Sequence, residues 1–223
     1  MAGRKKRSNI AKWTFGVYFA LMLTWTLAWV LKVNLDAQND WLAASTGSFV
    51  YWTTAKAFIW IAPAIALMRL SGRSLREVCN FPNWKSWLKW GGGIGLLIAL
   101  SGFIPKYLHN QPLFPTDISY ALFSATIITP LFEEFLMRGA ILGNLQYSYS
   151  FWKASILSSL MFLGLHLPGW FFLGTLTENL TKPAGGAISI FLLGLAFSYV
   201  VRRSKSFMGS AIAHSLNNLS SWR

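Results

Sequence analysis

The chain has 223 residues, of which 54% are hydrophobic and only 12% are charged, and its formal net charge at pH 7 is +13. About a quarter of the residues of an ordinary soluble domain are charged, so this composition excludes that class and predicts an integral membrane protein. The positive charge indicates contact with anionic membrane lipid, and no nucleic-acid partner is needed to explain it.

Long stretches between charges predict the membrane spans. A hydrocarbon core about 30 Å thick requires roughly 20 apolar residues per helix. In chain order, the stretches that approach this length cover about 12–32, 41–68, 90–108, 118–145, 152–167, 184–201 and 207–222. Lys56 is the one charge within the second stretch, and "LPGWFFLG" at 167–174 adds a short or re-entrant piece.

These spans predict an all-α fold, a polytopic transmembrane bundle of about 7–8 helices. No internal repeat or flexible linker divides the sequence, so we expect a single integral membrane domain over residues 1–223.

The loop charges predict the orientation of the bundle. With the N-terminus in the cytoplasm, 14 basic residues lie on the inner side, and four lie outside, namely Lys32, Lys106, Lys182 and Arg223. The positive-inside rule expects this asymmetry. We therefore predict a multi-pass protein of the cell membrane whose N-terminus is cytoplasmic.

The fourth span contains "LFEEFLMRG" at 131–139, with three ionisable groups at membrane depth. Each such charge costs roughly 2.5 to 3.5 kcal/mol, so they must be compensated. Glu134 and Arg138 are four residues apart on one helix face, which predicts an ion pair. Glu133 points about 100° away and keeps no countercharge, which makes it a candidate general base. The alternative is a buried network that only fixes the helix register.

Two histidines in later spans are candidate partners for this glutamate. A helical hairpin around "QYSYS" would bring His166 of "FLGLH" to the depth of Glu133. His214 lies in "AHSLNN", and Asn218 follows it by four residues on the same face. The pattern predicts a polar cavity that faces the cytoplasm and is lined by these four side chains.

The three motifs, taken together and in this order, resemble those of a known family. "EEFLMR", "FLGLH" and "HSLNN" are similar to the EExxxR, FxxxH and HxxxN motifs of the CPBP family, which includes CAAX prenyl endopeptidases and proteins linked to bacteriocin self-immunity. The resemblance covers about residues 118–222 and rests on Glu133, Glu134, Arg138, Phe162, His166, His214 and Asn218.

This resemblance implies a role for each motif residue. It implies an intramembrane glutamic protease, in which Glu133 and His166 hold and deprotonate a water molecule. His214 and Asn218 would stabilise the oxyanion that forms on the peptide carbonyl. The supporting residues would be Glu134, Arg138 and Phe162.

Cofactor and substrate follow less directly from the sequence. Hydrolysis without a cofactor is the first prediction; the alternative is a zinc ion bound by Glu133, His166 and His214. The paired histidines of the usual zinc-protease helix are absent from the sequence. We expect a peptide or prenylated-peptide substrate, of the CAAX type or related to bacteriocins.

Two other classes of function use similar residues. A non-catalytic immunity or scaffold protein could retain the site while protecting its host from a peptide toxin. A proton-coupled transporter could line a wet path with the same ionisable groups. The sequence shows no transporter-like repeat, so immunity ranks above transport.

Overall fold

The computed structural model describes residues 2–222, and the side chains of residues 9–222. Throughout the described part the chain is helical, with turns and no strand. The predicted all-α fold class is confirmed. Arg223 and the basic side chains between residues 4 and 7, which contribute to the predicted charge asymmetry, lie outside the described residues.

Six helices of the described part are long and apolar enough to cross a membrane: Asn9–Asp36, Ser45–Leu70, Leu75–Leu108, Tyr120–Leu145, Phe151–Phe172 and Ala187–Ser204. A further helix of 15 residues, α14 (Phe207–Ser221), packs among them. The predicted number of about 7–8 helices agrees with this bundle.

Several spans are composed of more than one helical segment. The first and fifth are the single helices α1 (Ala2–Asp36) and α11 (Phe151–Phe172), and the sixth is α13 (Ala187–Ser204). The second joins α3 (Ser45–Lys56), the π-helical η1 (Ala57–Ile61) and α4 (Ala62–Leu70). The third runs through α5 (Leu75–Cys79), η2 (Phe81–Asn83), α6 (Trp84–Trp87), η3 (Leu88–Gly92) and α7 (Gly93–Leu108).

The fourth span carries the glutamates. It runs through α8 (Tyr120–Phe123), η4 (Ser124–Ile128), α9 (Thr129–Glu134), η5 (Phe135–Leu142) and α10 (Gly143–Leu145). Of these, η4 and η5 are π-helical, an irregularity that is frequent at functional sites. Two short helices, α2 (Asp40–Ala43) and α12 (Leu176–Thr181), lie in connections between spans.

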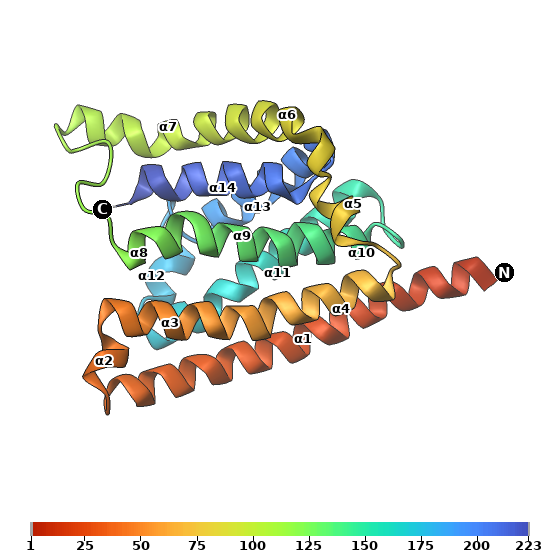
Figure 1. Cartoon of the computed structure of the whole chain (residues 1–223), viewed down its shortest axis with the longest axis horizontal. Helices are drawn as coiled ribbons and strands as arrows, with labels where there is room; N and C mark the ends of the chain where they lie inside the picture. Colours follow the sequence, from red (N-terminus) through yellow and green to blue (C-terminus); the bar gives the residue numbers. More distant parts are fainter. Residues whose placement is uncertain (1, 223) are drawn as a thin grey trace.

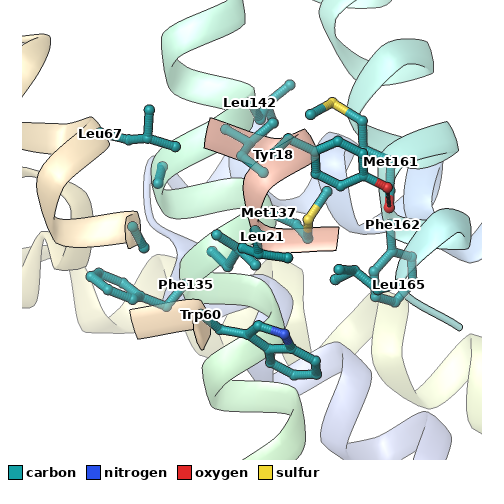
Figure 2. Packing of buried hydrophobic residues seen from close by; sticks show 14 of the residues in the cluster. Tyr18, Leu21, Trp60, Leu67, Phe135, Met137, Leu142, Met161, Phe162 and Leu165 are labelled. Atoms are coloured by element: carbon teal, nitrogen blue, oxygen red, sulfur yellow. Dashed lines mark hydrogen bonds between the residues drawn. The ribbon is translucent and has the colours of Figure 1, made fainter. Parts of the chain in front are cut away.

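The glutamate-bearing span lies in the interior of the bundle. In Figure 1, α1 and α3–α4 run along one side, α6–α7 and α14 run along the other, and α9 lies between them. All eight residues of η5 are buried. Its apolar side chains, including Met137 and Leu142, pack with Tyr18 and Leu21 of α1 and with Met161 of α11 (Figure 2). Apolar side chains on several faces of η5 favour this interior position, which also buries Arg138.

Arg73, in the turn between α4 and α5, fixes the far end of this span. Its Nη1 donates to the carbonyl oxygen of Gly139 at 2.7 Å, and its Nη2 donates to Ala140 O at 2.8 Å and to Asn144 Oδ1 at 2.6 Å. Burial lowers the pKa of Arg73, although a guanidinium stays protonated in proteins. The guanidinium of Arg73 therefore connects η5 to the turn between α4 and α5.

The fifth span is longer than predicted. Helix α11 continues through Pro168 and Gly169 to Phe172, and Gly174 then turns the chain with φ +70°. The predicted short or re-entrant piece at 167–174 is therefore wrong, since most of it is the last turn and a half of a continuous helix. Proline inside a helix removes one hydrogen bond, but neighbouring helices in a membrane protein can compensate for that loss.

Candidate active site

Glu134 and Arg138 form the predicted ion pair in the centre of the bundle. Oε1 of Glu134 lies 3.3 Å from Nη1 of Arg138, and neither side chain is exposed. Nη2 of the arginine also donates to the carbonyl oxygen of Gly194 in α13 at 2.9 Å. The guanidinium lies 4.5 Å from the ring centroid of Phe162 and 5.6 Å from that of Phe197. Two aromatic faces and a carbonyl thus orient the arginine toward its carboxylate.

His214 of α14 lies between the two glutamates. Its Nδ1 is 3.1 Å from Oε1 of Glu134, and its Nε2 is 3.8 Å from Oε2 of Glu133. A carboxylate can only accept, so Nδ1 carries the proton and donates to Glu134. The imidazole stacks on Phe197, with ring centroids 4.8 Å apart. The structure therefore connects the first and third motifs through one buried histidine.

His166 of α11 presents its other ring nitrogen to the interior. Nδ1 is 3.0 Å from the carbonyl oxygen of Phe162, one turn earlier in the same helix. Since a carbonyl oxygen only accepts, Nδ1 is the protonated nitrogen, and Nε2 of the neutral ring keeps a lone pair. The phenylalanine ring also meets the imidazole edge to face, at 5.0 Å. The second motif therefore fixes both the orientation and the tautomer of its histidine.

Two cavities meet at His166. The first, of about 270 Å³, is lined by Glu133 and His166, and the second, of about 730 Å³, is lined by His166, His214 and Asn218. Among the residues that the structure describes, no hydrogen bond joins Glu133 directly to His166. The structure brings the two side chains to one cavity wall, where a small molecule between them would contact both.

Asn218 is engaged with its neighbours. Its Nδ2 donates to the carbonyl oxygen of Ala125 in η4 at 2.8 Å, and its Oδ1 accepts from Nδ2 of Asn217 at 3.0 Å. The side chain still lines the larger cavity one helical turn from His214. An amide in this position connects α14 with η4, and because its nitrogen carries two hydrogens, the second N–H is left for a further acceptor in the cavity.

Lys56 is a further charged residue at this site, and the sequence analysis treated it only as an interruption of a span. Its Nζ donates to Oγ1 of Thr129 at 2.6 Å, and Thr129 lies four residues before Glu133 on the same helix face. Lys56 also lines the smaller cavity beside Glu133. None of the ion pairs among the described side chains joins Lys56 to Glu133, but the lysine is a basic group on the same cavity wall that the sequence did not assign to the site. A lone lysine in a predicted span was the available signal, since intramembrane charges mark functional sites by default.

The larger cavity extends toward the end of the bundle where α13 begins and α14 ends. Ala184, Gly185, Ser220 and Ser221 line it there. Helix α1 begins at the opposite end of the bundle (Figure 1). This placement differs from the sequence expectation, because a cavity at that end faces away from the cytoplasm if the N-terminus is cytoplasmic. Helix spacing predicted the depth of the residues but not the side from which they are reached.

The predicted zinc ligands do not form a metal centre here. Among the described residues, no group of three or more His, Cys, Asp and Glu side chains is placed to hold a metal ion. His214 directs both ring nitrogens toward carboxylates, with Nδ1 bonded to Glu134. The geometry of Glu133, His166 and His214 therefore fits a hydrogen-bonded network better than a metal-ligand set.

A bundle of membrane-length helices around buried carboxylates, histidines and an arginine defines a class of protein: a polytopic membrane protein with an ionisable site in its interior. Residues 115–220 match the family model described as Rce1-like, type II CAAX prenyl endopeptidase Rce1-like. No curated protein and no solved structure matches the chain. These residues, just under half of the chain, are therefore similar to this CAAX prenyl endopeptidase family, a part of the CPBP family whose members are peptide hydrolases.

Proposed function

We propose that this protein is an intramembrane endopeptidase that hydrolyses a peptide bond with a water molecule activated by Glu133, without a metal ion. The observation that carries the proposal is the position of His214: one ring nitrogen is bonded to Glu134, the other lies 3.8 Å from Glu133, and the imidazole lines the larger cavity. The family of residues 115–220 supports peptide hydrolysis as the reaction.

Glu133 and His166 are the proposed water-activating pair. The glutamate is only 6% exposed and shares the smaller cavity with the histidine. Because Nδ1 of His166 is occupied by Phe162 O, its Nε2 is the nitrogen that can accept a hydrogen bond from a water. The water then passes a proton to Glu133 as its oxygen attacks the peptide carbonyl.

His214 and Asn218 are the proposed oxyanion-stabilising donors. Since Nδ1 of His214 donates to Glu134, the ring donates from Nε2 only when it carries both protons, and the two glutamates supply the countercharge for that form. Asn218 donates through the second hydrogen of its Nδ2, since the first is bonded to the carbonyl oxygen of Ala125. Such donors, aimed at a developing negative charge, are each worth about 3 to 4 kcal/mol of transition-state stabilisation.

The remaining step returns the proton. When the tetrahedral intermediate collapses, the carbon–nitrogen bond breaks, and Glu133 gives its proton to the departing amine. The products are a carboxylic acid and an amine, and the acid then passes its proton to the amine, which gives a carboxylate and an ammonium group. Glu133 is again ionised. Glu134 and Arg138 do not enter the reaction; they hold His214 in position through the shared oxygen of Glu134.

The proposed substrate is a peptide of the CAAX type or a bacteriocin-related peptide that enters from the membrane. The proposed setting is the cell membrane with the N-terminus in the cytoplasm. The charge asymmetry supports this, since Arg73, Lys153 and Lys205 lie at the ends of helices on the side where α1 begins.

Comparative proteomics tests the reaction. Cells that carry the wild type, Glu133→Gln or the control Glu178→Gln are compared for peptides with changed termini. Glu178 is a suitable control because its side chain is 69% exposed, outside both cavities. We expect new termini with the wild type and the control, but not with Glu133→Gln. Equal termini in all three strains would refute hydrolysis by Glu133. Protection from a peptide toxin that survives Glu133→Gln would favour the immunity function instead.

A further inference from the structure

A third cavity lies at the end of the bundle where α13 ends and α14 begins, which is also the end where α1 begins (Figure 1). Its volume is about 270 Å³. The basic residues of its lining are Arg73, Arg138, Arg202 and Lys205. Glu77 is the one acidic residue among the described residues that line it. We call this space the basic cavity.

The positive charges of the basic cavity are not balanced by the chain. The carboxylate of Glu77 is exposed, and its Oε2 accepts from the backbone nitrogen of Ser74 at 2.6 Å and from the hydroxyl of the same residue at 3.0 Å. None of the ion pairs among the described side chains includes Arg73, Arg202 or Lys205. A concave site with one dominant sign of charge attracts ligands of the opposite sign, so this lining favours an anion.

The arginines of the basic cavity keep hydrogen-bond donors for such a ligand. The guanidinium of Arg73 makes four hydrogen bonds, which leaves one of its five N–H groups. The guanidinium carbon of Arg202 lies 4.5 Å from the ring centroid of Phe151, so its face is occupied while its N–H groups point outward in the plane. Nε of Arg138 is buried and has no hydrogen-bond partner in the described part of the chain. Acceptor oxygens in the cavity would therefore find donors already in place.

Two helix N-termini add to the positive potential. Helix α11 begins at Phe151 and α14 begins at Phe207, and both residues line the basic cavity. The backbone N–H groups in the first turn of a helix have no partner within the helix, and they favour an anion. The side chain of Ser150, the N-cap of α11, makes no hydrogen bond to that turn.

The carboxyl end of α13 lies at the same cavity, and its carbonyl oxygens would repel an anion. Two oxygens at this end are already engaged. The carbonyl oxygen of Ser204 accepts from Nδ2 of Asn83 at 3.0 Å, and that of Lys205 accepts from Nδ2 of Asn80 at 3.2 Å. The basic side chains of Arg202 and Lys205 therefore determine the sign of the potential here.

A phosphate group has the chemistry that this lining recognises. Its oxygens accept from the planar fork of an arginine and from the ammonium of a lysine at the same time. The cavity is slightly smaller than the range of roughly 300 to 1,000 Å³ typical of small-molecule sites, which suits one phosphate group with a small substituent. Basic pockets between helices at the membrane surface bind anionic lipid head groups. A choline head group would bring a cation into the basic lining, so an anionic head group is favoured over a zwitterionic one.

We propose that the basic cavity binds an anionic phosphate group, held by Arg202, Lys205 and the remaining N–H group of Arg73. The phosphate belongs to an anionic lipid head group or to a free phosphate ion, which share this chemistry. None of the four proposed catalytic residues lines the basic cavity, so the inference goes beyond the proposed hydrolysis and does not depend on it. Because Arg73 also bonds the carbonyl oxygen of Gly139, a bound phosphate would contact the residue that holds η5.

Native mass spectrometry tests the lipid as the source of the phosphate. The purified full-length protein is released from nanodiscs that contain phosphatidylglycerol and phosphatidylcholine in equal amounts, and the retained lipids are counted. The test variant is Arg202→Gln with Lys205→Asn, since asparagine tolerates the left-handed backbone of position 205, where φ is +58°. The control is Arg203→Gln with Lys153→Gln, which removes the same charge from exposed residues that also lie over aromatic rings but do not line the cavity.

We expect the wild type and the control to retain phosphatidylglycerol in preference to phosphatidylcholine. The ratio of the two lipids should fall roughly tenfold in the test variant, because two basic contacts are lost. A preference that persists in the folded test variant, with folding checked by circular dichroism, overturns the proposed contacts.

A second titration tests free phosphate. Sodium phosphate is added to the protein in nanodiscs of phosphatidylcholine alone, with calorimetry as the readout. Saturable binding by the wild type that is lost in the test variant, without a preference for phosphatidylglycerol, supports the site with free phosphate as the ligand. If the wild type shows neither a lipid preference nor phosphate binding, the proposal is overturned, and this comparison needs no variant to fold. Neither measurement requires peptide cleavage, so failure of the proposed hydrolysis would leave both results interpretable.

Discussion

Oε1 of Glu134 lies 3.1 Å from Nδ1 of His214 and 3.3 Å from Nη1 of Arg138. One carboxylate oxygen thus connects α14 with the span that carries the glutamates. Through Arg138 the same network reaches the carbonyl oxygen of Gly194 in α13. Three helices are therefore held together at the depth where the proposed reaction takes place.

Glu134→Gln should destabilise the protein far more than Glu133→Gln. The first substitution leaves the fully buried guanidinium of Arg138 without a countercharge, and breaking such a buried pair costs about 3 to 5 kcal/mol. The second removes a carboxylate whose ion-pair partner, His214, is 3.8 Å away. Denaturant unfolding of both variants in detergent measures the difference. Similar unfolding midpoints would contradict the supporting role of Glu134.

Gly91→Ala should weaken the packing of η3 on α14. A Cβ at this position would lie 2.2 Å from the carbonyl oxygen of Gly209, so the two helices must separate. Overpacking of this kind typically costs about 1 to 3 kcal/mol. Gly92→Ala is the matched control, because nothing lies within 4 Å of its Cβ position. The thermal unfolding temperature should fall for the first variant and stay near the wild-type value for the second.

Asn218→Leu should lower kcat with little change in KM. The amide is the proposed oxyanion donor, and removing one such donor typically costs about 100- to 1,000-fold in kcat. Asn34→Leu serves as the control, since Asn34 is exposed and its amide donates to Val30 of its own helix, outside both cavities. Steady-state kinetics with a cleavable peptide provide the measurement. A loss confined to KM would assign Asn218 to substrate binding.

Chelators should leave peptide cleavage unchanged. The proposed reaction uses Glu133 as the base, and the described side chains do not form a group of metal ligands. Purified protein treated with phenanthroline and dialysed should retain the activity of the untreated sample. Lost activity that returns on adding zinc would establish the alternative site of Glu133, His166 and His214.

Surface labelling should show on which side the larger cavity lies. The one cysteine, Cys79, is replaced by serine, and single cysteines are introduced at the exposed positions Ala184 and Lys85. With a cytoplasmic N-terminus, an impermeant maleimide added to intact cells should label position 184 but not position 85. The reverse pattern would show that the bundle is inverted and that the cavity faces the cytoplasm.

Helix periodicity was sufficient to predict a contact between two residues of the same helix. The pair of Glu134 and Arg138 follows from spacing alone. The contact of His214 with both glutamates does not, because it depends on how α14 is rotated against α9. The π-helical turns of η4 and η5 flank the glutamates and change the rotation per residue, so regular helix spacing does not determine which neighbouring helix each glutamate faces.

Other differences have similarly local causes. The fifth span was expected to end near residue 167, yet α11 continues through Pro168 and Gly169, since packing in the bundle overrides their low helix propensity. Lys56 could be found from the sequence as an unexplained charge, but its proximity to Glu133 depends on the packing of η1 against α9. The sequence did not indicate which helices pack against one another.

The hydrogen bonds from Arg73 to the carbonyl oxygens of Gly139 and Ala140 have a mechanical consequence. Those carbonyls lie only five and six residues beyond Glu134, so a turn at the surface of the bundle sets how deep the carboxylates sit. Movement of that turn along the bundle axis would carry the glutamate pair with it. The position of the two glutamates along the bundle axis is therefore determined by the turn between α4 and α5, at the end of the bundle, and not by the length of the helix that bears them.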